Sequence, residues 1–404
     1  MCSSISHKPV VMTVYGTRPE AIKVAPVIQK LEKDDRFQSV SVSTGQHREM
    51  LEQVNRMFGI QPDHNLNIMK SGQTLNEIVS RAISGLDRII AEVKPDVVIS
   101  QGDTSTAMAA AVAAFNRGVQ VVHLEAGLRT GNINSPFPEE ANRKLIGQVT
   151  KLHLAPTSKS KDNLLREAIP SEDIVITGNT VIDALLHARQ AHTPFQDEHL
   201  EDFTDSYKRL VLVTTHRREN LEAMSNIGRA MRRLSETYPN VGFVLPAHLN
   251  PRVREAVLPE LEGAPNILVT EPLPYSEFTR LMDTSTMVLT DSGGVQEEAP
   301  ALAKPVLVMR ENTERPEAVT AGTVRLIGTD EDRIVAETQT LLEVESAYQA
   351  MANAVNPYGD GKAASRAVAA IAELTNVGTR EPDFEPDIAT DNPKSEYQRE
   401  IPSL

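Results

Sequence analysis

Short apolar runs alternate along the chain with segments whose apolar residues recur at helical spacing. The first run covers Val10–Tyr15, and the segment at residues 19–31 then places Ile22, Val27 and Leu31 on one helical face. Similar runs follow at residues 40–43, 96–100, 119–124, 152–155, 174–176, 209–215, 241–245, 267–270, 287–290, 305–308 and 324–327. Strands that alternate with helices are typical of a parallel sheet covered on both faces. The pattern therefore predicts an α/β protein.

The alternating pattern falls into two sets, which predicts two Rossmann-like domains, each built on a doubly wound parallel sheet. Residues 192–205 are polar and charged and are expected to connect the sets. The domains are therefore placed at residues 1–190 and 191–356. A break at residues 356–359 (NPYG) precedes a last helical segment at residues 362–374.

Length and composition agree with this division. A chain of 404 residues with 40% hydrophobic content exceeds what one core usually organises. Residues 376–404 are acidic, contain prolines and have few apolar side chains, which predicts a disordered tail. Cys2 is the single cysteine, so an intramolecular disulfide and a cysteine-rich metal site are excluded.

The net charge of −14 argues against nucleic acid or an anionic membrane as a partner, because both would be repelled at long range. No apolar stretch approaches the roughly 18 residues that a membrane span requires, and residues 1–9 lack the apolar segment of a signal peptide. We therefore expect a soluble, cytoplasmic protein. An anionic substrate would have to be bound by a local basic pocket.

Polar residues follow the predicted first strand, where ligands of open α/β sheets bind. Residues 16–20 read GTRPE, and Lys23 lies one turn into the helix. Pro19 suits a first helical position, and Arg18 offers a planar guanidinium to a phosphate. A capped turn with solvated charges explains the same residues equally well.

Three carboxylates stand near the ends of later strands. Asp103 follows the 96–100 run, Glu125 follows the 119–124 run, and Glu139 stands where a loop opens into a helix. An isolated Asp in such a place is most often an N-cap, and acidic residues in a first turn usually complement the helix dipole. Convergence of all three on one rim favours acid and base chemistry or stabilisation of a cation.

Basic and glycine-rich motifs follow two strands of the second set. Residues 216–220 read HRREN, and a histidine beside two arginines at a strand end favours ligand binding. Residues 291–298 read DSGGVQEE, in which the glycines let backbone amides approach a diphosphate and Glu298 is placed to accept from ribose hydroxyls. Arg315 is a further candidate for a phosphate contact. Since neither a P-loop lysine nor GxGxxG is present, the sequence favours a sugar nucleotide over ATP or NAD. These residues predict a nucleotide-sugar enzyme, and a glycosyltransferase fits equally well.

Five motifs in collinear order, between about Val10 and Leu374, resemble the non-hydrolysing bacterial UDP-N-acetylglucosamine 2-epimerases. They are GTRPE at 16–20, HLEAGLR at 123–129, PEE at 138–140, HRREN at 216–220 and DSGGVQEE at 291–298. The resemblance implies the GT-B fold, with two domains facing a central cleft and a C-terminal helix at residues 357–375 that joins the first domain. It also implies interconversion of UDP-N-acetylglucosamine and UDP-N-acetylmannosamine, by anti elimination of UDP to 2-acetamidoglucal and re-addition, for cell-surface polysaccharide.

The resemblance also assigns site residues. Chemistry would be carried by Asp103, Glu125, Glu139 and His216, with Arg143 as a supporting contact. UDP would be held by Arg18, Lys23, His216, Ser292, Gly293, Gly294, Glu298 and Arg315, with Leu273 and Phe278 near the uracil. We give the proton transfers to Asp103 and Glu125 and an electrostatic or acid role to Glu139. No cofactor or metal is expected, the ligands would be UDP-N-acetylglucosamine and UDP, and the family implies a homodimer.

Many bacterial members are also activated by UDP-N-acetylglucosamine at a second site beside the first. Gln46, Arg217 and His248 resemble positions involved there. Glu49 stands where the family pattern has Gln, and Gly72 where some members have Arg. A carboxylate in place of an amide and the loss of a cation both weaken a diphosphate contact, so activation is a hypothesis for this chain.

Three alternatives stay open. A hydrolysing 2-epimerase would use the same elimination but release free N-acetylmannosamine and UDP. A GT-B glycosyltransferase would need an acceptor and would leave the substrate unepimerised without one. A non-catalytic nucleotide-sugar sensor is disfavoured, because the carboxylate set has no obvious use in binding alone.

Overall fold

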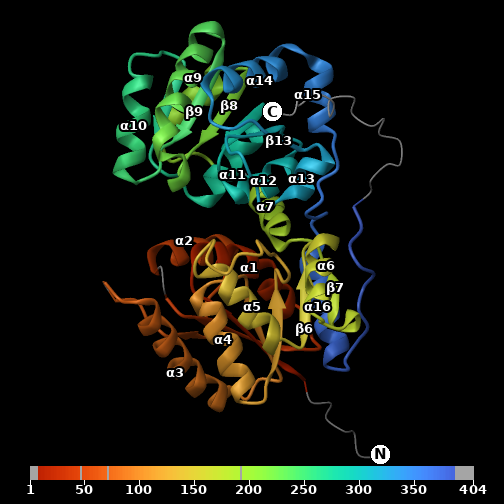
Figure 1. Ribbon diagram of the computed structural model, residues 1–404. Helices are drawn as coiled ribbons and strands as arrows, with labels where there is room; N and C mark the ends of the chain where they lie inside the picture. Colours follow the sequence, from red (N-terminus) through yellow and green to blue (C-terminus); the bar gives the residue numbers. More distant parts are fainter. Residues whose placement is uncertain (1–7, 46–47, 71, 192, 387–404) are drawn as a thin grey trace, which may run out of the picture.

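Two α/β domains, each built on one parallel sheet, form the protein in this computed structural model (Figure 1). The structure describes residues 8–45, 48–70, 72–191 and 193–386. The predicted fold class is confirmed in both halves of the chain.

The first domain carries a seven-stranded parallel sheet in the order β3-β2-β1-β4-β5-β6-β7. Its strands are β1 (Val10–Tyr15), β2 (Gln38–Ser43), β3 (His64–Asn65), β4 (Val97–Gln101), β5 (Gln120–Leu124), β6 (Leu152–Ala155) and β7 (Ile174–Ile176). The strand order reverses between β1 and β4, which pair in parallel from Val11 with Val97 to Val14 with Ser100. A ligand crevice in such a sheet lies beyond the carboxyl ends at this reversal.

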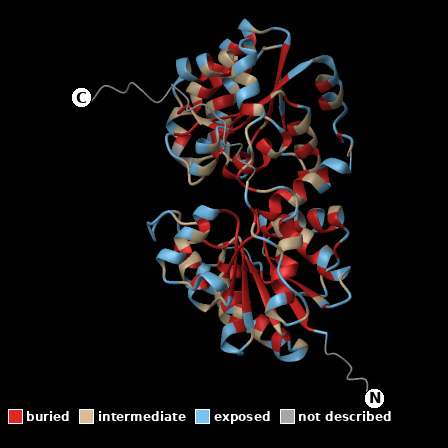
Figure 2. Cartoon of the chain, turned by 90° about the vertical axis from the view of Figure 1, so that its right-hand side faces the viewer, coloured by how far each residue is buried: buried red, intermediate tan, exposed pale blue. Residues whose placement is uncertain are grey.

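Helices cover both faces of the first sheet, and Figure 2 shows its buried strands between helices with exposed outer faces. The helices are α1 (Arg18–Glu32), α2 (Arg48–Phe58), α3 (Leu75–Val93), α4 (Ser105–Asn116), α5 (Glu139–Val149), α6 (Ser158–Arg166) and α7 (Thr180–Gln190). Buried alanines of α4, including Ala110 and Ala114, leave little side-chain bulk, so α4 packs closely against the sheet and α3.

The second domain repeats this arrangement with a six-stranded parallel sheet in the order β10-β9-β8-β11-β12-β13. Its strands are β8 (Arg209–Thr214), β9 (Val241–Pro246), β10 (Ile267–Thr270), β11 (Met287–Thr290), β12 (Val306–Val308) and β13 (Val324–Leu326). The strand order reverses between β8 and β11, which places a second crevice beyond their carboxyl ends.

The helices of the second half complete the fold. They are α8 (Glu198–Ser206), α9 (Met224–Thr237), α10 (Pro251–Leu261), α11 (Tyr275–Thr284), α12 (Gly293–Glu298), α13 (Pro316–Ala321), α14 (Glu331–Glu343), α15 (Glu345–Ala352) and α16 (Ala363–Leu374). Among the described residues, no helix is long and apolar enough to cross a membrane.

Over its described residues, the chain crosses between the domains twice. Helix α7 leads from the first domain toward the second, and the segment after α15 returns to place α16 on the first domain (Figure 1). Residues of α16 share a buried cluster with α1 and α7. The Asp183 carboxylate of α7 accepts the backbone N–H groups of Ala363 at 3.2 Å and Ala364 at 2.9 Å, which fixes the start of α16. The helix thus begins at residue 363 rather than 357.

The expected connector at residues 192–205 contains a helix that the apolar pattern did not predict. Asp197 caps α8, because its side chain accepts the backbone N–H of His199 at 2.9 Å. Leu200 is buried and Phe203 packs partly buried against the same core. The apolar stripe of α8 is so short that its composition resembles a loop.

The prediction of disorder from residue 376 is wrong for residues 376–386. The backbone N–H of Phe384 donates to the Ile176 carbonyl at 2.7 Å, and Asp383 accepts the Ile176 N–H at 3.1 Å. Lys161 forms an ion pair with Asp383 at 3.1 Å, and the Phe384 ring is buried. These contacts hold the segment against the edge strand β7, and residues 387–404 lie outside the described residues.

Candidate active site

The carboxyl ends of the two sheets contribute residues that meet at the domain boundary. Arg18 Nη2 donates to the Leu273 carbonyl oxygen at 3.4 Å, and Asn179 Nδ2 donates to Glu297 Oε2 at 3.1 Å. Each contact joins one residue from each domain. The two predicted groups, carboxylates after the first sheet and phosphate-binding residues after the second, therefore face one another.

The turn after β1 is a capping box. Thr17 Oγ1 accepts the Glu20 N–H at 3.4 Å, while the buried Glu20 carboxylate accepts the N–H groups of Gly16 at 2.6 Å and Thr17 at 2.7 Å. The capped turn considered from the sequence is therefore present. It fixes the start of α1 and with it the positions of Arg18 and Lys23.

Arg18 is the residue of this turn that reaches the second domain. Burial lowers the pKa of its guanidinium, while the nearby Glu298 carboxylate opposes that shift. Leu273 and Phe278, predicted near the base, pack partly buried against the main core. Arg18 thus places a desolvated positive charge beside the predicted nucleotide residues.

Glu125 follows β5 with a positive φ of 66°, a backbone conformation that is uncommon outside glycine and clusters at functional sites. Three donors hold its carboxylate. Lys23 forms an ion pair with Oε1, Gln101 Nε2 donates to Oε2 at 2.6 Å, and Asn179 Nδ2 donates to Oε1 at 3.1 Å. Burial opposes ionisation, but Lys23 and Arg315 outweigh it and lower the pKa of the Glu125 carboxyl. Glu125 is therefore held as a carboxylate, the form that can accept a proton.

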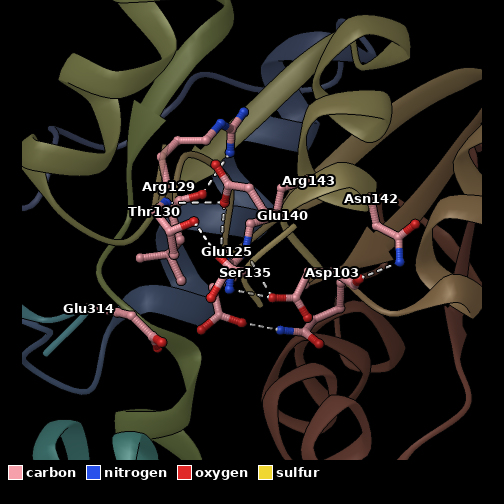
Figure 3. A network of polar contacts seen from close by, with 12 residues as sticks. Asp103, Glu125, Arg129, Thr130, Ser135, Glu140, Asn142, Arg143 and Glu314 are labelled. Atoms are coloured by element: carbon pink, nitrogen blue, oxygen red, sulfur yellow. Dashed lines mark hydrogen bonds and ion pairs between the residues drawn. The ribbon is translucent and has the colours of Figure 1, made fainter. Parts of the chain in front are cut away.

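Asp103 follows β4 and is oriented by Arg143 of α5 (Figure 3). Arg143 Nε and Nη2 lie 2.9 and 2.7 Å from Asp103 Oδ2, and Arg143 Nη1 lies 3.2 Å from the fully buried Glu140 carboxylate. Asn142 Nδ2 also donates to the Asp103 carbonyl at 2.9 Å. The Asp103 side chain keeps 27% exposure, so it is fixed in direction and still open to a ligand.

Glu139 is the first residue of α5, and Glu140 beside it fixes the preceding loop. The Glu140 carboxylate accepts the N–H groups of Thr130 at 3.1 Å and Gly131 at 3.2 Å. Glu139 Oε2 is buried and has no hydrogen-bond partner among the described residues. Since a buried carboxylate oxygen without a donor is costly, Glu139 is suited to accept from a ligand or to carry a proton.

His216 is positioned by the buried Asp291 carboxylate. Asp291 accepts the backbone N–H groups of His216 and Arg217, both at 2.9 Å, and its Oδ1 lies 3.1 Å from His216 Nδ1. Burial opposes ionisation of Asp291, but His216 and these N–H groups lower its pKa. With Nδ1 directed at Asp291, Nε2 is the ring nitrogen that can reach a ligand.

The predicted regulatory residues lie partly beside His216. The His248 ring stacks on the His216 ring at 5.6 Å between centroids, and Arg217 Nε is buried without a hydrogen-bond partner among the described residues. Gln46 lies outside the described residues, as does the side chain of Glu49. The structure thus connects part of the predicted second site to the predicted active site.

The start of α12 packs tightly against Arg315. Ser292 is the N-cap and makes no side-chain capping bond. A Cβ on Gly293 would lie 2.5 Å from Arg315 Nη1, and Arg315 Nε donates to Glu297 Oε1 at 2.6 Å. Gly294 is open, because a Cβ there would lie 4.0 Å from its nearest neighbour, Glu298 Oε2. The two glycines therefore serve different purposes. Gly293 allows Arg315 to pack closely against the helix start, and Gly294 leaves the backbone open to a ligand.

Glu298 is buried and accepts a hydrogen bond from the Tyr275 hydroxyl at 2.9 Å. Burial raises its pKa to about 7, assisted by the neighbouring Glu297 carboxylate and opposed by Tyr275, Lys23 and Arg18. Glu298 thus changes charge near neutral pH.

Several residues of this network were not assigned from the sequence. Asp291 and Glu297 lie inside the DSGGVQEE motif, and Gln101 directly precedes the glycine before Asp103, so their motifs carried a signal. Asn179 follows the predicted strand at 174–176, and this place at a strand end was its only signal. Within the described chain, no three His, Cys, Asp or Glu side chains are grouped to hold a metal ion.

Two parallel-sheet domains whose carboxyl ends meet at a shared site define a GT-B fold. The family model for UDP-N-acetylglucosamine 2-epimerase matches residues 29–372. The UDP-N-acetylglucosamine 2-epimerase of Salmonella typhimurium is 52% identical over 367 residues, covering 89% of this chain and 98% of that protein. The chain belongs to the UDP-N-acetylglucosamine 2-epimerase family, a family of isomerases.

Solved structures of relatives have the same fold. The UDP-GlcNAc 2-epimerase of Neisseria meningitidis bound to UDP-GlcNAc is 46% identical, with a TM-score of 0.82 over 90% of this chain and 100% of that one. The enzyme of Methanocaldococcus jannaschii in complex with UDP-GlcNAc and UDP is 33% identical, with a TM-score of 0.74 over 91% of this chain and 100% of that one. The similarity thus extends over both domains.

Proposed function

We propose that the protein interconverts UDP-N-acetylglucosamine and UDP-N-acetylmannosamine without hydrolysis, and so supplies N-acetylmannosamine for cell-surface polysaccharide. The observation that carries this proposal is the arrangement at the domain boundary. Ionised Glu125 and oriented Asp103 stand on one side, and Arg315 and His216 stand on the other. The relatives named for binding UDP-GlcNAc and UDP support the choice of ligand.

Departure of UDP would begin the reaction, because the C2 proton is not next to a carbonyl and is barely acidic. The C1–O bond must loosen first. Arg18, Lys23 and His216, with the backbone after Ser292, would stabilise charge that develops on the departing diphosphate. Lys23 forms an ion pair with Glu125, so its charge would be shared between that carboxylate and the diphosphate.

The carboxyl groups of Asp103, Glu125 and Glu139 would act on the sugar ring. Positive charge on the ring is stabilised by a nearby carboxylate, as in glycoside hydrolysis. Removal of the C2 proton and its return on the opposite face require more than one carboxyl group, and we give these transfers to Asp103 and Glu125. Glu139, whose Oε2 is buried without a donor among the described residues, fits an acid or electrostatic role. Re-addition of UDP to enzyme-bound 2-acetamidoglucal then completes the epimerisation.

Proton NMR in deuterated water tests the proposal. Purified protein is incubated with UDP-N-acetylglucosamine alone, and we expect UDP-N-acetylmannosamine that carries deuterium at C2. Free N-acetylmannosamine with UDP would instead show a hydrolysing 2-epimerase. Unchanged substrate would contradict both and favour a glycosyltransferase or a sensor.

A further inference from the structure

Asn179 lies where both crossings between the domains come together. It is the N-cap of α7, and its Oδ1 accepts the Val181 N–H at 3.1 Å. Its own backbone N–H donates to the Tyr358 carbonyl at 2.6 Å, in the segment that returns to the first domain. The backbone and Oδ1 therefore serve the fold, which leaves the side-chain NH₂ group for other partners.

That NH₂ group bridges two carboxylates from different domains. Asn179 Nδ2 lies 3.1 Å from Glu125 Oε1 and 3.1 Å from Glu297 Oε2. An amide nitrogen carries two hydrogens, so one can go to each carboxylate. Asn179 is 3% exposed, so water does not readily replace either bond.

The bridge sits in the middle of a row of alternating charges. Lys23 of α1 pairs with Glu125, and Arg315 of the second domain pairs with Glu297. The other titratable groups close to this row are Glu298 of α12, Glu314, whose Oε2 lies 3.3 Å from Arg315 Nη1, and Tyr358 of the returning segment. A neutral double donor is the side chain that can join two carboxylates here without adding charge, because aspartate would face both with oxygen atoms.

We propose that Asn179 is a positioning residue for epimerisation, whose side-chain amide orients the Glu125 carboxylate. Because the same amide also donates to Glu297, the orientation of Glu125 depends on the position of the second domain. The inference rests on the proposed function of Glu125. Movement of the second domain away from the first would break the bond to Glu297. The geometry of Glu125 would then depend on how the domains are arranged, which links proton transfer to enclosure of the substrate.

Two substitutions separate this role from helix capping. Asn179→Asp keeps an N-cap oxygen but replaces the double donor with an acceptor. Asn179→Ser also keeps an N-cap oxygen, and its hydroxyl can donate to at most one carboxylate. Asn250→Ser, at the N-cap of α10, is the matched control for the shorter cap. Asn226→Asp, on α9, is the control for an added charge.

The first measurement is the pH dependence of kcat in the epimerisation assay. Asn179→Asp is expected to move the acid limb upward by about one pH unit, because a third carboxylate raises the pKa of its neighbours. Asn179→Ser is expected to lower kcat by about tenfold with KM within about twofold of wild type, since the orientation of Glu125 is lost and nucleotide contacts are kept. Both controls should keep wild-type profiles. Wild-type profiles for the two Asn179 variants would overturn the proposal.

Thermal unfolding tests the bridge formed by Asn179 with a measurement that does not depend on catalysis. The pH is varied from roughly 4.5 to 8, a range chosen to begin near the ordinary pKa of a carboxyl group. The aspartate introduced by Asn179→Asp would have a raised pKa in the folded protein. The amount by which the Tm of this variant lies below that of wild type should therefore grow as pH rises. Asn179→Ser should show a deficit that is independent of pH. If the wild-type protein does not epimerise UDP-N-acetylglucosamine, the proposed function is wrong. The unfolding series still tests the hydrogen bonds from Asn179 to the two carboxylates. Equal pH dependence of Tm in Asn179→Asp and wild type would overturn the proposed bridge.

Discussion

His216 Nδ1 lies 3.1 Å from Oδ1 of Asp291, and the same carboxylate accepts the His216 backbone N–H at 2.9 Å. One buried side chain therefore fixes both the main chain and the ring of a predicted site residue. Asp291→Asn removes the ring acceptor, so we expect kcat to fall by about 10- to 100-fold. Asp183→Asn, which also removes a buried carboxylate that accepts backbone N–H groups, is the control. It should lower Tm and keep kcat, and equal kcat in both variants would contradict the role of Asp291.

Asp103→Asn tests the proton-transfer assignment. Asp103 contacts Arg143 and Asn142 rather than the residues predicted to hold UDP, so the variant should lose turnover and keep UDP affinity. Isothermal titration with UDP and the NMR assay in deuterated water measure the two properties. Loss of UDP binding by a folded variant would reassign Asp103 to a ligand-holding or structural role.

The paired glycines of α12 should respond differently to alanine. A Cβ at Gly293 would press on the Arg315 guanidinium, which Glu297 holds in place, so Gly293→Ala should lower Tm as well as UDP affinity. A Cβ at Gly294 would lie 4.0 Å from its nearest neighbour, so Gly294→Ala should keep Tm. If a diphosphate approaches the backbone there, UDP affinity should still fall by about tenfold, or 1.4 kcal/mol. Unchanged UDP affinity in Gly294→Ala would place the diphosphate elsewhere.

Glu298 predicts a pH dependence of stability. Its pKa is raised to about 7 in the fold, above an ordinary value of about 4.3 in the unfolded chain. The contribution of Glu298 to the free energy of unfolding is therefore fully present below the unfolded pKa and is lost as pH rises through about 7. The free energy of unfolding differs between these two limits by on the order of 3 kcal/mol. As pH rises from about 4 to about 7, Tm of Glu298→Gln should rise relative to wild type, because the unfolded and folded pKa values of Glu298 set this window. Glu236→Gln, on the exposed face of α9, is the control. A constant difference between Glu298→Gln and wild type would contradict this prediction.

Activation by substrate can be tested at the His216 and His248 stack. If a second UDP-N-acetylglucosamine binds beside Arg217 and His248, initial rates should be sigmoidal, and added UDP-N-acetylglucosamine should accelerate the reverse reaction. His248→Ala should then abolish the sigmoidal shape, because the ring that contacts His216 is removed. Hyperbolic rates in the wild type, with no effect on the reverse reaction, would exclude activation in this chain.

Most strands were predictable because they form short apolar runs, and runs such as Val10–Tyr15 and Met287–Thr290 are buried along their whole length. Strand β3 was missed because it consists of two polar residues, His64 and Asn65. Helix α8 was missed because few of its residues are apolar. The contact between Phe384 and Ile176 was missed because it joins residues that are distant in sequence.

The place of the candidate site was predictable to the extent that its residues follow strands. Asp103, Glu125 and His216 each stand just beyond a strand end, where a parallel sheet directs side chains to one edge. The role of Asn179 was not predictable, because an Asn before a helix usually signals only a cap. Its second partner, Glu297, belongs to the other domain, and strand patterns carry no information on how domains meet.

Helix α16 and the segment that ends at Phe384 have a consequence for synthesis on the ribosome. Both pack on the first domain, yet they are translated after the whole second domain. The surfaces of α1 and α7 that α16 covers, and the edge of β7, stay uncovered until α16 and Phe384 have emerged behind the second domain. The first half made is therefore among the last parts of the molecule to be completed.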